Sequence, residues 1–247
     1  MVMHDYDSDG SKVVLLLHPM LASGSLMYEL IGSQLGDSIR CLAPDFGAHG
    51  DQRGTEFVSA SVEADQVMDY LHHMNVSHID LAYGASLGGA VLTELLKRGL
   101  KPDQAYFEGT SFFVNARLLT KIVSRVFIKK HRRAVADHER AVVAMGELYG
   151  KSNAEAFADQ FIAMSEASIH NIAVSCGNNE PAVLSPDMQA RCTFAYGAKD
   201  PNMIKAKKGC LRAYPDAHLV VWDGFGHCDK IIADTTAYAQ MLRGYLL

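Results

Sequence analysis

The stretch from Gly84 to Gly89, which reads Gly-Ala-Ser-Leu-Gly-Gly, constrains the fold more than any other part of the chain. It follows an apolar run at residues 79–83 that predicts a buried strand, and it precedes residues 90–97, whose leucines fall at helical spacing. A serine on so tight a turn takes a strained backbone conformation, and glycines two positions to either side leave room for it. This order of strand, turn and helix around Ser86 is typical of a nucleophile elbow. A glycine-rich turn of this kind can also bind phosphate, so the other loops must decide between the two interpretations.

Composition and charge exclude several classes of function. The chain of 247 residues has a formal net charge of −5, which leaves no basic excess to neutralise the phosphates of a nucleic acid. No apolar run approaches the length of a membrane-spanning helix, and the N-terminal residues lack the cationic start and apolar core of a secretory signal. The five cysteines are widely scattered. We therefore expect free thiols, rather than a disulfide framework or a metal site, and a cytoplasmic location.

Apolar runs that predict strands alternate along the chain with segments that predict helices. Such alternation indicates a doubly wound α/β fold with a mostly parallel sheet covered by helices on both faces. A short edge strand is expected before Asp7. The other expected strands are residues 13–17, 39–43, 79–83, 105–108, 192–196 and 219–222. The expected helices include residues 25–35, residues 59–74, one that opens at Asp200-Pro201, and residues 231–246.

The region from residue 110 to residue 185 interrupts this alternation. No strand is obvious there, and two patterns of apolar residues at helical spacing predict amphipathic helices. The first pattern contains Leu119, Ile122, Val123, Val126 and Phe127, and the second contains Phe157, Phe161, Met164 and Ile169. We therefore predict an α/β core formed by residues 1–109 and 186–247, with residues 110–185 as a helical insertion.

The loops that follow the strands of a parallel sheet gather at one edge, where they form the site. The first long strand leads into His18-Pro19-Met20, and the strand at residues 79–83 leads to Ser86. Asp200 follows the strand at residues 192–196, and His227 follows the strand at residues 219–222. A hydroxyl, a carboxylate and an imidazole therefore reach the same edge in the chain order Ser, Asp, His.

These features resemble the α/β-hydrolase family, and the resemblance covers nearly the whole chain. The matching motifs are His18-Pro19, the loop from Pro44 to Gly50, the elbow around Ser86, Tyr196 to Asp200, and Gly224 to His227. The resemblance implies a catalytic triad of Ser86, Asp200 and His227, with no metal and no cofactor. It also implies that the inserted helices form a cap over the site.

The chemistry of acyl transfer explains why these residue types are needed together. A serine hydroxyl is a poor nucleophile near neutral pH, so His227 would remove its proton and Asp200 would fix the tautomer of the imidazole. The backbone N–H of Leu87 is one expected donor to the oxyanion hole, and the resemblance assigns the second donor to Met20. The family usually has glycine where this chain has Pro19, and a proline has no N–H to offer.

Several of these residues also have structural interpretations. Asp200 fits the N-cap of a helix with a proline at its first position, and Glu108 is a rival for the role of the acid. His18 and His49 fit structural hydrogen-bonding roles, Asp45 would brace its loop, and Cys228 would be a small packed residue. The candidates for the substrate pocket are His18, Phe112, Phe113, Phe157, Phe161 and Met164. For most of the apolar candidates we favour packing of the insertion onto the core.

The sequence thus predicts a serine hydrolase that cleaves a carboxylic ester of small or medium size through an acyl-enzyme intermediate. The expected partner is a small ester-like molecule, with no nucleic acid and no membrane span. Two alternatives stay open. The same triad could serve acyl transfer or the hydrolysis of a carbon–carbon bond, and the fold could also bind a ligand without turnover.

Overall fold

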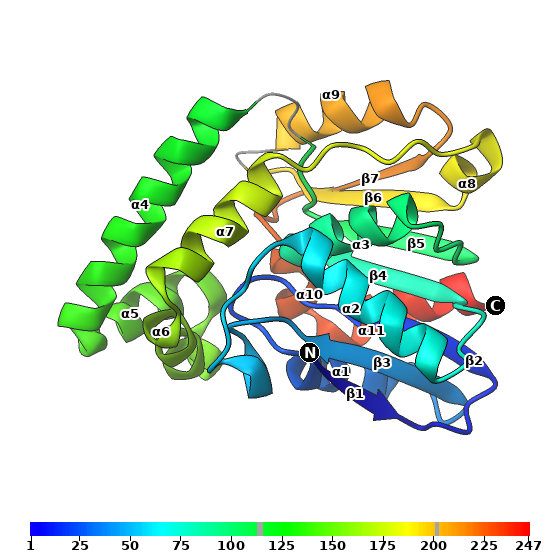
Figure 1. Cartoon of the computed structure of the whole chain (residues 1–247), viewed down its shortest axis with the longest axis horizontal. Helices are drawn as coiled ribbons and strands as arrows, with labels where there is room; N and C mark the ends of the chain where they lie inside the picture. The colour runs from blue at the N-terminus through cyan, green and yellow to red at the C-terminus, as the bar shows by residue number, and fades with distance from the viewer. Residues whose placement is uncertain (113–115, 201–202) are drawn as a thin grey trace.

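The computed structural model describes residues 1–112, 116–200 and 203–247, and a seven-stranded sheet forms their centre (Figure 1). The strand order is β1-β3-β2-β4-β5-β6-β7, in which β1 runs antiparallel to β3 and every other pair is parallel. The predicted doubly wound, mostly parallel sheet is therefore confirmed. The strands are β1 Val2–Tyr6, β2 Lys12–Leu17, β3 Ile39–Asp45, β4 Leu81–Ala85, β5 Gln104–Glu108, β6 Cys192–Gly197 and β7 His218–Trp222.

Helices cover both faces of this sheet, and the central strands alternate their side chains between two apolar layers. Leu15 and Leu17 of β2 pack in one layer, whereas Val14 and Leu16 pack in the other, as the two-residue period of a strand requires. The first layer is covered by α2 Ala60–His73, α3 Leu87–Lys97 and α9 Met203–Ala213. The second layer is covered by α1 Gly24–Leu30, α10 Asp229–Ala233 and α11 Thr235–Arg243.

Between β5 and β6, the described residues form the helices α4 to α7, followed by the short helix α8 Pro186–Ala190. They are α4 Arg117–Ala136, α5 His138–Tyr149, α6 Ala154–Ala163 and α7 Glu166–Gly177. Figure 1 shows α4 to α7 beyond the carboxyl ends of the parallel strands, rather than on a face of the sheet. Two serine hydroxyls of α7 hold this group to the loop before α2, because Ser168 accepts from the N–H of Phe57 and Ser175 from the N–H of Ala60, both at 3.1 Å.

The structure departs from the expected helices in three places. The apolar pattern from Phe157 to Ile169, which predicts one helix, is divided between α6 and α7, because Met164 is extended and the side chain of Ser165 accepts the N–H of Ser168 to cap α7. The helix expected over residues 25–35 ends at Leu30, and a 3-10 turn at Gly32–Gln34 follows it. The helix expected over residues 231–246 is divided at Asp234, whose side chain accepts the N–H of Ala237 and so caps a new helix, α11. The predicted helix start at Pro201 lies outside the described residues. Within the described part of the chain, no helix has both the length and the apolarity to cross a bilayer.

Candidate active site

Ser86 occupies the turn between β4 and α3 in a strained backbone conformation. Its φ of 49° and ψ of −105° fall outside the common regions for a residue with a side chain, and such strain costs on the order of 1–3 kcal/mol. The glycines around it allow the turn to form. A Cβ on Gly84 would approach the carbonyl oxygen of Gly88 to 2.7 Å, and one on Gly88 would collide with the carbonyl of Leu17. The turn is held to the next strand by the N–H of Ser86, which donates to the carbonyl of Glu108 at 2.8 Å.

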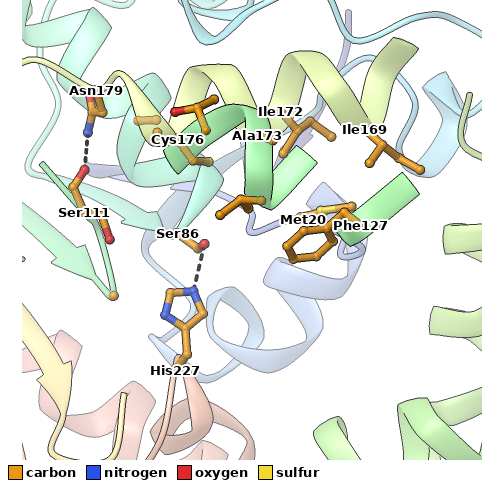
Figure 2. Close-up of a pocket in the computed structure, with 15 residues that line it drawn as sticks. Met20, Ser86, Ser111, Phe127, Ile169, Ile172, Ala173, Cys176, Asn179 and His227 are labelled. Carbon is orange, nitrogen blue, oxygen red and sulfur yellow. Dashed lines mark hydrogen bonds between the residues drawn. The ribbon is translucent and has the colours of Figure 1, made fainter. Parts of the chain in front are cut away.

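Ser86, His227 and Asp200 form one continuous chain of hydrogen bonds. The Ser86 hydroxyl lies 2.9 Å from Nε2 of His227, as Figure 2 shows, and Nδ1 of the same ring lies 2.6 Å from a carboxylate oxygen of Asp200. A carboxylate can only accept, so the proton of the neutral ring belongs on Nδ1. Nε2 is therefore the acceptor that faces the Ser86 hydroxyl, which is the arrangement that a general base requires.

Negative charge beside His227 raises the pKa of its imidazole well above the usual 6.5. An ionised Cys228 sulfur would be the larger cause of the raised pKa. The carboxylate of Asp200 also raises the pKa, through its hydrogen bond and its charge. Burial itself raises the pKa of the Cys228 thiol, which keeps that thiol neutral near neutral pH. We therefore assign the rise in the pKa of His227 at neutral pH to Asp200.

The turn after β2 is fixed by the buried side chain of His18. Nδ1 of its ring donates to the carbonyl of Pro19 at 2.8 Å, and Nε2 accepts the N–H of Phe46 at 3.1 Å. Burial lowers the pKa of His18 to about 4, so the ring is neutral and both bonds persist across the neutral range. Met20, which follows this turn, lines a cavity together with Ser86, and its role as an oxyanion donor stays a prediction. The other predicted donor, Leu87, is the first residue of α3, so its N–H has no acceptor within the helix.

Comparison with known proteins supports a single fold. No family model and no curated protein matches the sequence. Among solved structures, a carboxylesterase of the thaumarchaeon Nitrososphaera gargenis matches 99% of this chain and 93% of its own, with a TM-score of 0.76 and 19% identity. An α/β hydrolase enzyme from a Medee basin deep-sea metagenome library matches 99% and 93%, with a TM-score of 0.75 and 11% identity. The chain has the α/β-hydrolase fold. MenH from S. aureus, at 16% identity, a TM-score of 0.72 and 99% and 97% coverage, is similar too.

In the described part of the chain, two cavities meet at Ser86, with volumes of about 280 and 210 Å3. They share the side chains of Met20, Ser86, Phe127 and His227. The larger cavity, called here the first cavity, extends beneath α7 and includes Ser111 and Asn179 in its wall (Figure 2). The second cavity lies between α1, α5, α6 and α10, and its wall is mostly apolar.

The residues predicted to line a substrate pocket divide into two groups. Phe157 and Phe161 line the second cavity. His18, Phe112 and Met164 are not among the residues that line these two cavities. His18 is committed to its backbone hydrogen bonds, Phe112 packs in an aromatic cluster with Phe107, Phe194 and Tyr214, and Met164 is buried in the core. The predicted pocket residue Phe113 lies outside the described residues.

Sequence reasoning missed several side chains that line the cavities, among them Phe127, Asn179 and Tyr149. Phe127 belongs to the apolar pattern predicted for α4. The residues of that pattern are not all buried on one face of the helix. Val123 and Phe127 line the first cavity, whereas Ile122 and Val126 are about half exposed, at 51% and 48%. The helical period was correct, yet it could not tell which face meets the site.

Glu108, the rival acid, is buried behind the site and makes a different contact. Its carboxylate accepts the hydroxyl of Tyr238 at 2.8 Å, while Nδ1 of His227 is paired with Asp200. Burial raises the pKa of Glu108 to about 7. Its backbone carbonyl, which accepts the N–H of Ser86, is the part of Glu108 that contacts the elbow. The structure therefore gives the position of the acid to Asp200.

The other polar residues singled out near the site have structural partners. Asp45 accepts the N–H groups of Gly24 and Asp51, both at 2.7 Å, and so braces its loop as predicted. The ring of His49 contacts the carbonyl of Gly47 at 2.9 Å, and burial lowers its pKa to about 3. Among the described residues, two clusters have suitable spacing for a metal ion, and neither includes Ser86, Asp200 or His227. They are His4 with Asp45 and Asp51, and His78 with Asp80 and Asp103.

Proposed function

We propose that this protein is a serine hydrolase that cleaves a carboxylic ester of small or medium size through an acyl-enzyme intermediate. The observation that carries the proposal is the continuous chain from Asp200 through His227 to Ser86, set on a strained turn where two cavities meet. Esterases among the similar structures agree with it, but they share the fold at low identity, and one fold supports many reactions.

The reaction would begin when Nε2 of His227 removes the proton of Ser86 as the serine oxygen attacks the ester carbonyl. The N–H groups of Leu87 and Met20 would stabilise the oxyanion, and removal of one such donor typically costs about 3 kcal/mol of transition-state stabilisation. The protonated imidazole would then give its proton to the leaving alcohol, which leaves an acyl group on Ser86. Water activated by the same imidazole would release the acid.

We further propose that residues 110–185 act as a cap and that residues 1–109 and 186–247 form the catalytic core. Phe127 of α4 and Ile172 of α7 lie in the wall of the first cavity, so the inserted helices would exclude water from the reacting atoms. A cytoplasmic location is consistent with the five cysteines, all of which are unpaired.

Labelling with a fluorophosphonate probe, followed by a panel of aryl esters, tests this proposal. We expect wild type to be labelled and to cleave at least part of the panel, and Ser86→Ala to lose both properties. Label retained in Ser86→Ala would remove Ser86 as the nucleophile. Labelling without ester hydrolysis would favour acyl transfer or carbon–carbon bond hydrolysis, and a wild-type protein that takes no label would favour a ligand-binding role.

A further inference from the structure

Away from Ser86 and His227, the polar side chains in the wall of the first cavity include Asn179 and Ser111, and the rest of the wall is largely apolar (Figure 2). Asn179 follows α7 and Ser111 follows β5, so the two residues come from opposite ends of the insertion. We propose that they bind a neutral hydrogen-bond donor of the substrate, such as a hydroxyl or an amide N–H. The inference rests on the proposed function and names its substrate class: esters that carry such a group on one side of the scissile bond.

The neighbours of Asn179 fix the orientation of its side-chain amide. Nδ2 donates to the carbonyl oxygen of Ser111 at 3.2 Å and to the hydroxyl of Thr93 at 3.4 Å. The Thr93 hydroxyl gives its own proton to the carbonyl of Gly89 at 2.8 Å, so it can only accept from Asn179. Because both neighbours are acceptors, the NH2 group must face them. The amide oxygen, Oδ1, is therefore directed away from these partners.

Oδ1 of Asn179 is an unused acceptor. Among the residues that the structure describes, none donates a hydrogen bond to it, although the side chain is buried at 4% exposure. Thr120, in the same cavity wall, has a buried hydroxyl oxygen with no partner among the described residues. Buried polar groups normally have partners, so unpaired acceptors around a cavity indicate a ligand or water that supplies the donor.

The remainder of the cavity wall indicates that this donor is neutral. No lysine, arginine, aspartate or glutamate lies among the described residues of the wall. The thiol of Cys176 is also uncharged, because burial raises its pKa to about 12. A carboxylate would find no cation here beyond the imidazole of His227, and an ammonium group would find no carboxylate. A hydroxyl or an amide N–H fits this wall best.

The second cavity gives a contrast within the same site. Most of its wall is apolar, including Leu26, Leu30, Met145 and Leu148, although Lys130 and Tyr149 also line it. The substrate would therefore have a half that carries a hydrogen-bond donor, bound in the first cavity, and an apolar half, bound in the second. Ser86 lies at the junction, where the ester bond would be cleaved.

Two matched pairs of esters test this inference. One pair is an aryl hexanoate and the corresponding 6-hydroxyhexanoate, and the other is butyl butanoate and 4-hydroxybutyl butanoate, so the hydroxyl is placed on the acyl or on the alcohol side. We expect wild type to prefer the hydroxylated member of one pair by about tenfold in kcat/KM, since one buried hydrogen bond is worth about that factor. The pair that shows the preference identifies which half enters the first cavity.

Three variants separate binding from a merely structural role. Asn179→Leu should lose the preference, so that the two members of the pair are cleaved with nearly equal kcat/KM. Ser111→Ala should lose part of the preference, because it keeps the carbonyl that holds Asn179. Asn171→Leu is the matched control, since Asn171 lies on α7 outside both cavities and donates to the carbonyl of Phe57 at 3.0 Å. It should keep the full preference.

Each outcome decides the inference. Cleavage without a hydroxyl preference in either pair overturns it while the proposed function stands. A preference that persists in both Asn179→Leu and Ser111→Ala overturns it as well. It is also overturned if Asn179→Leu has a lowered Tm and loses the same factor in rate on both members of a pair. Absence of both ester cleavage and fluorophosphonate labelling overturns the proposed function, and the inference with it.

Discussion

Gly109 is the residue whose substitution best tests the geometry of the site. It follows β5 with a φ of +62°, and its N–H donates to the carbonyl of Ala195 at 2.8 Å. A Cβ at this position would lie 2.9 Å from both Cε1 of His227 and Sγ of Cys228, and 3.0 Å from Nδ1 of the same ring. Gly109→Ala should therefore displace the imidazole from its place between Asp200 and Ser86.

The size of the effect follows from these distances. Ordinary carbon contacts are about 3.5–4.0 Å, so the ring would have to move by roughly 0.5–1 Å. The hydrogen bond between Oγ of Ser86 and Nε2 of His227 is 2.9 Å long. A shift of the ring by about 0.5–1 Å would take these two atoms out of productive alignment. Misplacement by about 1 Å can cost on the order of 100-fold in rate, or about 2.7 kcal/mol of barrier. We expect that loss in kcat/KM.

A second glycine separates displacement of the ring from strain in the backbone. Gly99 has a φ of +89°, and a methyl group added to its Cα would have no neighbouring atom within 4 Å. Gly99→Ala therefore carries the left-handed strain of about 1–2 kcal/mol without touching the site. Aryl ester hydrolysis, the rate of fluorophosphonate labelling and thermal unfolding should be measured on both variants. The reasoning would be refuted if Gly109→Ala were as stable as Gly99→Ala and kept its kcat/KM within about threefold of wild type.

Three further predictions follow from the pKa values and contacts of the site. The kcat/KM of wild type should rise with pH to a midpoint above 6.5, because the neutral form of His227 is the base and its pKa is raised. Asp200→Asn should move the midpoint down and lower the maximum by about 10,000-fold. Glu108 has a pKa raised from 4.5 to about 7, so the folded state prefers its protonated form, and the free energy of unfolding should fall by about 3 kcal/mol between pH 4.5 and 7. Glu108→Gln should flatten that dependence in urea titrations. His18→Leu should lower the free energy of unfolding by about 1–3 kcal/mol, because it leaves the buried N–H of Phe46 without an acceptor.

The contrary results are equally specific. A midpoint below 6.5 for wild type, or one that Asp200→Asn leaves in place, would contradict the assigned partner of His227. An unfolding free energy that depends on pH in the same way in wild type and Glu108→Gln would mean that this carboxyl is not the group that titrates. Unchanged stability in His18→Leu would show that its ring does not fix the turn.

The architecture was predictable because it depends on patterns that extend over many residues. Runs such as residues 13–17 and 192–196 had to be buried strands, and their alternation with helices allowed few topologies. The edge of the sheet where Ser86, Asp200 and His227 meet followed from the same rule, since loops after parallel strands share one edge. The structure brings these three side chains into hydrogen-bonding contact.

The cavity walls were less predictable because they depend on how helices of the insertion rotate against the core. Phe112 and Met164 are as apolar as Phe157 and Phe161, yet only the latter two face a cavity. Asn179 carries no sequence signal, since its role depends on the acceptors around it after folding. Helix ends were also missed where a single side chain decides them, as Asp234 does for α11.

The pairing of β5 with β6 affects how such a protein can evolve. Ala105 lies beside Cys192 in the sheet, although 86 residues separate them along the chain. The sheet keeps its register whatever the intervening segment contains, provided that both ends return to these strands. Selection could therefore lengthen, shorten or replace the segment between them and alter which molecules are accepted, while the machinery that breaks the bond is inherited intact.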